Sequence, residues 1–168
     1  CFLGAGSCGV AWNSLGLALL TAATCTALGL AFALIVVRTD FKYRRLARLL
    51  TVMPIITPSF VLGMGLILIF GRSGLVNHAS TYFFDVSMGR WIYGFNGIWL
   101  AQVFSFTPTA FLILIGVVEG ISPTMEEASQ TLRASRMRTF LKVTLPLMMP
   151  GLANGFLVVF IESRLLIR

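Results

Sequence analysis

Charged residues are scarce in this sequence, and their absence from long stretches is its strongest signal. Only 11% of the 168 residues are charged, whereas 57% are hydrophobic; soluble domains usually carry about 25% charged residues. Four stretches contain no charged residue at all, and the length of each is close to the ~20 residues that cross a bilayer as a helix. The composition therefore excludes a soluble domain and predicts an all-α, polytopic membrane helix bundle. The four predicted spans are residues 15–37, 49–70, 95–118 and 143–161.

Residues that support catalysis, metal binding or ion coupling are also missing. The sequence has one histidine, His78, no G-x4-G-K-[ST] phosphate loop and no H-E-x-x-H motif, so neither a hydrolytic triad nor a nucleotide site is supported. No predicted span carries a carboxylate, histidine or cation, which an ion-coupled transporter normally needs. We predict no catalytic residue, no metal ligand and no cofactor in this chain.

Cysteine is sparse and shows no metal or redox pattern. Cys1, Cys8 and Cys25 lack CxxC spacing; Cys25 is typical of a small apolar packing residue, and Cys1 and Cys8 either pair in an oxidising compartment or stay free. Because the chain starts with Cys1, without a basic segment before its first apolar run, we interpret it as a fragment or processed chain rather than one with a signal peptide.

The positive charge has a simple topological explanation. A net charge of +7 is also found in nucleic-acid-binding proteins, but membrane proteins retain Lys and Arg on the cytoplasmic side. Loop 38–48 has five such residues, loop 71–94 two and loop 119–142 four. This alternation predicts cytoplasmic loops 38–48 and 119–142 and an outside N-terminus. The basic run in loop 38–48 favours an orientation signal over a specific ligand site.

Loop 119–142 has more internal pattern than a connector. Thr124 and Glu127 have the T-x-x-E form of a capping box, which begins a helix. Apolar and small residues then recur at helical spacing, first from Met125 to Leu132 and again from Met137 to Leu141. The pattern predicts two short amphipathic helices; a helical hairpin lying on the membrane surface fits it equally well.

The residues of this loop resemble a known family motif. Glu127-Ala128-Ser129, then Arg133, then Val143-Thr144-Leu145-Pro146 are similar to the EAA motif, E-A-A-x3-G-x9-I-x-L-P, of permease subunits of binding-protein-dependent ABC importers. The resemblance implies an incomplete permease domain over 1–168, with four of the five core helices, whose loop 119–142 docks in a groove of the ATPase. The implied coupling residues are Met125, Glu126, Glu127, Ala128, Ser129, Leu132, Arg133, Leu145 and Pro146.

Two positions depart from the family pattern. Arg133 replaces the motif glycine, so either the turn moves to the next residues or the two helices run on as one. Residues 162–168 occupy the place where the family has an outer loop and another span, which indicates truncation or an altered tail.

The resemblance also implies partners and cargo. It implies a multi-pass protein of the bacterial inner membrane, working with an ABC ATPase subunit that binds ATP, a second permease domain and a periplasmic or extracellular substrate-binding protein, in lipid and without nucleic acid. The segment 39–74 looks most like ferric-iron importer permeases, which makes ferric iron the expected cargo. Phosphonate, thiamine or polyamine cargo remains open, as does a channel or a non-transporting membrane scaffold.

Prolines mark candidate positions on the translocation path. Pro54 and Pro58, with Thr57 and Ser59 beside them, interrupt the second span, and such breaks are tolerated where protein or water satisfies the freed backbone groups. Glycines spaced by four, at 116/120 and 151/155, predict close helix contacts, and the amides of Asn96, Gln102 and Asn154 predict hydrogen bonds between helices.

Overall fold

The structure, a computed structural model, describes residues 8–38, 44–57, 59–84, 92–121, 131 and 135–166. These residues form helices and turns without a strand, as the all-α prediction requires. In chain order the elements are α1 (Cys8–Arg38), α2 (Arg44–Val52), η1 (Met53–Ile56), α3 (Ser59–Phe70), α4 (Leu75–Phe84), α5 (Phe95–Glu119), α7 (Arg136–Thr139), η2 (Phe140–Thr144) and α8 (Leu145–Leu166).

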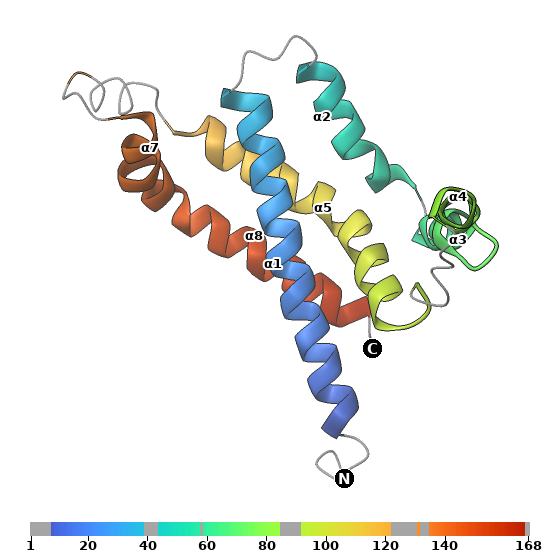
Figure 1. Cartoon of the computed structure of the whole chain (residues 1–168). Coiled ribbons are helices and arrows are strands. Elements are labelled where there is room, and N and C mark those ends of the chain that lie inside the picture. The colour runs from blue at the N-terminus through green and yellow to red at the C-terminus, as the bar shows by residue number, and fades with distance from the viewer. Residues whose placement is uncertain are drawn as a thin grey trace.

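Helices α1, α5 and α8 form the centre of the bundle, and they cross one another in Figure 1. One cluster of buried side chains joins Phe111 and Leu114 of α5 to Met148 of α8 and Ala33 of α1. A second lies about two turns away along α5 and includes Cys25 of α1. Because lipid tails are as apolar as these side chains, close packing, rather than exclusion from water, holds such helices together.

Glycine permits the closest approaches in this bundle. A Cβ atom at Gly29 would lie 2.9 Å from the backbone nitrogen of Phe111, so α1 and α5 are in backbone contact there. A Cβ atom at Gly151 would collide with the side chain of Val117, in agreement with the contact predicted for that glycine pair. Gly116, from the other predicted pair, faces open space. Four-residue spacing alone therefore did not identify the contact faces.

The second charge-free stretch, residues 49–70, differs from the single helix that was predicted. Helix α2 ends at Val52, a 3-10 turn follows in η1, and Thr57 is extended at φ −82° and ψ 124° before α3 begins. Pro54 lacks an N–H donor, and a residue that precedes a proline, as Thr57 precedes Pro58, is pushed out of the helical region. The two prolines thus divide the stretch into two helices.

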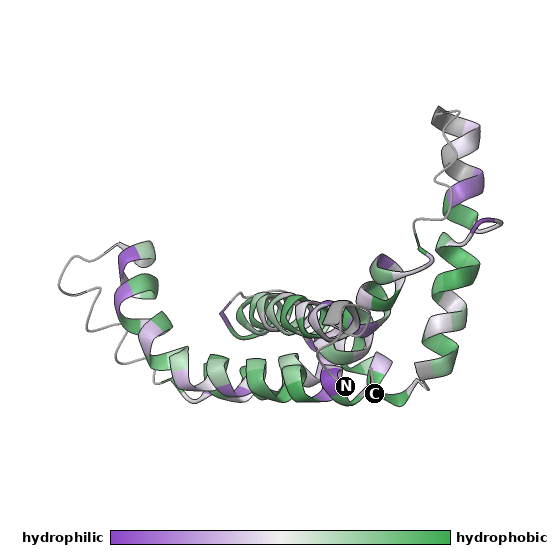
Figure 2. Cartoon of the chain, turned by 90° about the horizontal axis from the view of Figure 1, so that it is seen from below, coloured by the Kyte–Doolittle hydropathy of each residue, from purple (hydrophilic) through white to green (hydrophobic). Residues whose placement is uncertain are grey.

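Four helical segments are still long and apolar enough to cross a membrane: Trp12–Arg38, Phe60–His78, Phe95–Glu119 and Met137–Leu165. In its most apolar window α5 is 56% buried, whereas the segment containing α3 is only 17% buried. Helices α3 and α4 lie apart from α1 and α8 in Figures 1 and 2, and Figure 2 shows hydrophobic residues along most of the length of the bundle. Such an exposed apolar surface requires lipid or further protein around it.

Candidate functional site

The predicted coupling segment is described only at its end. Leu145 is half-buried and Pro146 is exposed on the first turn of α8. The other predicted coupling residues lie outside the described residues, so their roles remain predictions; they are Met125, Glu126, Glu127, Ala128, Ser129, Leu132 and Arg133.

The chain enters α8 through an irregular turn. The backbone N–H of Thr139 donates to the carbonyl of Ser135 at 2.9 Å, and the N–H of Arg138 lies 3.4 Å from the Ser135 hydroxyl, which caps α7. Residues Phe140–Thr144 then form a π-helical turn in which the N–H of Leu145 donates to the Phe140 carbonyl. Pro146 cannot donate to the ordinary α-helical acceptor four residues before it, which accounts for the wider turn just ahead of it. The motif's Leu-Pro pair therefore stands at a helix irregularity.

Both loops predicted to be cytoplasmic meet at one end of the bundle. The end of α1, the start of α2, the end of α5 and helix α7 all lie toward the top of Figure 1. Arg48 of α2 pairs with Glu119 at the end of α5 at 3.3 Å, with both side chains about half exposed. A pair with that exposure contributes at most about 1 kcal/mol. The pair is informative about position, since it places the end of loop 38–48 beside the start of loop 119–142.

A buried amide joins the three central helices. Gln102 of α5 is only 2% exposed, and its Oε1 accepts hydrogen bonds from the hydroxyls of Thr21 of α1 at 2.9 Å and Ser163 of α8 at 3.0 Å. The predicted interhelical role of Gln102 is confirmed, whereas Asn96 and Asn154 are exposed. The two hydroxyl partners were not predicted, because Ser and Thr are common in spans and most bond to their own helix.

Replacing Gln102 by leucine is expected to loosen this junction. Interhelical hydrogen bonds in membranes average about 0.6 kcal/mol and reach about 1.7 kcal/mol, so loss of two bonds should lower the unfolding free energy by about 1–3 kcal/mol. Thermal unfolding in detergent measures the change, with Asn96→Leu, an exposed amide on the same helix, as the control. In a Thr21→Val/Ser163→Ala background the Gln102→Leu effect should shrink; an undiminished effect would contradict the assigned hydrogen bonds.

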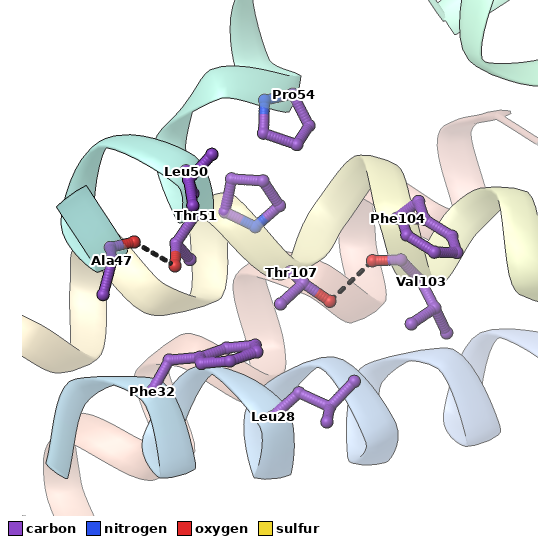
Figure 3. A pocket seen from close by; sticks show the side chains of 10 residues that line it. Leu28, Phe32, Ala47, Leu50, Thr51, Pro54, Val103, Phe104 and Thr107 are labelled. Atoms are coloured by element: carbon purple, nitrogen blue, oxygen red, sulfur yellow. Dashed lines mark hydrogen bonds between the residues drawn. The ribbon is translucent and has the colours of Figure 1, made fainter. Parts of the chain in front are cut away.

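An apolar cavity lies between α1, α2 and α5, and one predicted path residue, Pro54, is part of its wall. Its volume is about 520 Å³. Figure 3 shows Leu28 and Phe32 of α1 on one side and Leu50, Thr51 and Pro54 opposite them. Ala47, Val103, Phe104, Thr107 and Pro108 complete the lining.

Two hydroxyls in the cavity wall are already satisfied. Thr51 donates to the Ala47 carbonyl at 2.8 Å and Thr107 donates to the Val103 carbonyl at 2.6 Å, as the dashed lines in Figure 3 show. The cavity therefore offers an apolar ligand a surface and offers a metal ion no carboxylate, histidine or cysteine. Of the predicted path residues, Pro54 lines it and Thr57 does not; the side chains of Pro58 and Ser59 lie outside the described part.

Comparison with known proteins defines the class. The fold and the EAA-like segment are those of a multi-pass membrane transport subunit, and the family model for the binding-protein-dependent transport system inner membrane component matches residues 14–166. The chain belongs to this family of ABC importer permeases, as its motif predicted.

Similar proteins are named for different transported substrates. The chain is 44% identical, over 90% of its length, to a ferric transport system permease protein of Actinobacillus pleuropneumoniae, of which it covers 22%. It is 29% identical to the molybdenum transport system permease protein ModB of Escherichia coli K12, over 80% of this chain and 58% of that protein. The chain thus spans between 22% and 58% of the length of these relatives.

The fold has a solved counterpart. A bacterial alginate ABC transporter, crystallised with an alginate pentasaccharide-bound periplasmic protein, contains a chain that superposes with a TM-score of 0.80 at 15% identity. The match covers 94% of this chain and 57% of the other. The predicted helical permease architecture is therefore confirmed.

Proposed function

We propose that this chain is the membrane-spanning part of an ATP-driven importer of ferric iron. The observation that carries the cargo assignment is the 44% identity to a ferric transport permease over 90% of the chain. Identity falls to 29% for a sulfate and a molybdenum permease and to 28% for a spermidine/putrescine permease. Over nearly its whole length the chain thus resembles the ferric-type permease more than the other three.

The energy source and the selectivity belong to other subunits in this proposal. Loop 119–142, with Glu127, Ala128 and Ser129 at the motif positions, docks on an ABC ATPase that binds and hydrolyses ATP. A separate binding protein delivers iron at the opposite face, and a second permease unit completes the path near Pro54, Thr57, Pro58 and Ser59. The charge alternation supports an outside N-terminus with loops 38–48 and 119–142 in the cytoplasm.

Reconstitution tests the proposal. The full-length permease is placed in liposomes with its ATPase inside and its binding protein outside, and uptake of radioactive ferric iron is followed with and without ATP. We expect uptake that needs ATP and the iron-loaded binding protein. Molybdate, sulfate and spermidine with the same assembly are the controls, and transport of one of these in place of iron would refute the cargo assignment.

A further inference from the structure

A second cavity is lined by neighbouring positions of α1 and α2, at the end of the bundle where Arg48 and Glu119 meet. It has a volume of about 340 Å³ and is lined by Val36, Val37, Arg45, Arg48 and Glu119. On α2 its Arg48 directly follows Ala47 of the apolar cavity, and on α1 its Val36 stands one turn beyond Phe32. The two cavities together are called the α1–α2 groove below. The second cavity, with its charged side chains, is the head of the groove, and the apolar cavity is its trough.

The length of the groove suits one half of a bilayer. On α1 its lining extends from Val37 to Leu28, which at 1.5 Å per residue is about 13 Å. Half of a ~30 Å hydrocarbon core is about 15 Å. The whole groove, head and trough together, is therefore about as long as one leaflet of the hydrocarbon core is thick.

The charge at the head of the groove favours an anion. Arg48 shares its charge with Glu119, whose carboxylate also lines the head, but a guanidinium has five N–H donors and retains some for a second acceptor. Arg45 is exposed and has no ion-pair partner among the described residues. Two cations against one carboxylate leave a net positive site.

We propose that the α1–α2 groove binds an anionic phospholipid, with its phosphate at Arg45 and Arg48 and an acyl chain along Leu28, Phe32 and Leu50. Basic pockets between helices at a membrane surface are suited to anionic headgroups. The satisfied hydroxyls of Thr51 and Thr107 leave the trough without competing polar groups. The basic run of loop 38–48 thereby gains a ligand in addition to its role in orientation. This inference concerns lipid and is independent of the cargo.

Lipid titration with the full-length permease in neutral detergent tests the headgroup. Native mass spectrometry compares dioleoyl phosphatidylglycerol with dioleoyl phosphatidylcholine, which has the same chains and no net charge. We expect preferential binding of phosphatidylglycerol, weakened about fivefold by Arg45→Gln and little changed by Arg72→Gln, an exposed arginine at a distant turn. Equal binding of both lipids, or equal effects of both substitutions, would overturn the proposal.

Two further arms test the trough and its occupant. Glycerol phosphate carries the anion with no acyl chain, and dihexanoyl phosphatidylglycerol carries it with short chains. We expect both to bind far more weakly than the dioleoyl lipid. Equal binding would reduce the site to a phosphate site and overturn the lipid assignment.

In the second experiment, the complete importer is extracted with its native lipid. Retained anionic lipid that Arg45→Gln removes supports the proposal, whereas its absence from the assembled complex would mean that protein fills the groove.

Discussion

Reversing the charge of Glu127 (Glu127→Lys) is expected to leave the permease inserted in the membrane while ATP-driven uptake falls about tenfold or more. Glu127 is the acidic residue of the EAA-like motif, and in the proposed function it faces a cation of the ATPase. Juxtaposed like charges cost several kcal/mol at an interface, and ~1.4 kcal/mol already corresponds to a factor of ten. Uptake and binding-protein-stimulated ATP hydrolysis are both measured in the reconstituted complex.

A graded control separates charge from folding in this experiment. Glu127→Gln removes the attraction without adding repulsion, and because an exposed ion pair is worth only ~0–1 kcal/mol, its effect should be several times smaller. Membrane abundance should be equal for the wild type and both variants. If Glu127→Lys retained wild-type stimulated ATP hydrolysis, the coupling role of this loop would be refuted, while iron uptake could still support the cargo assignment.

Valine at Gly29 is expected to separate α1 from α5 and to destabilise the bundle by about 3 kcal/mol or more. A Cβ atom there meets the backbone of Ala110 and Phe111 at 2.9–3.0 Å, and backbone atoms cannot move aside as a side chain can. Overpacking of this kind typically costs about 1–3 kcal/mol, and more where the backbone must shift. The melting temperature in detergent should fall by roughly 6–12 °C.

Gly16 provides the matched control on the same helix. Its Cβ position has no neighbouring atom within 4 Å, so Gly16→Val introduces the same side chain without a collision. We expect a change of less than about 0.5 kcal/mol, as for most surface substitutions. Similar losses in the two variants would show that helix propensity, rather than the contact of α1 with α5, governs stability.

Much of the architecture could be predicted because hydrocarbon imposes a simple rule. A span must be long, apolar and internally hydrogen-bonded, so residues 15–37 and 95–118 were identified by the absence of charge. The second coincides closely with α5, and the first lies within the longer α1, which begins at Cys8. Counting basic residues placed loops 38–48 and 119–142 on one face, and the Arg48–Glu119 pair joins the two at one end. The family was identified from residues 127–146, and the match over residues 14–166 confirmed it.

Other features depend on which side chains share a face. The positions of Pro54 and Pro58 predicted an interruption of the second span, but the division of residues 49–70 into α2, η1 and α3 emerged only in the structure. Gln102 was recognised as a hydrogen-bonding residue, yet Thr21 and Ser163 lie 81 and 61 positions away. No local pattern distinguishes these two hydroxyls from those that bond within their own helices.

The sequence by itself determined that this protein lies in lipid, that its fold is all-α, which of its loops lie together and which family motif it carries. Each of these depends only on composition or on spacing along one chain. The tertiary structure alone decided that Gly29 rather than Gly116 permits close packing, and that Gln102 joins three helices. It also placed two basic residues of loop 38–48, Arg45 and Arg48, at the head of an apolar groove through the approach of α2 to α1. These features depend on the crossing of helices, which no repeat along the chain specifies.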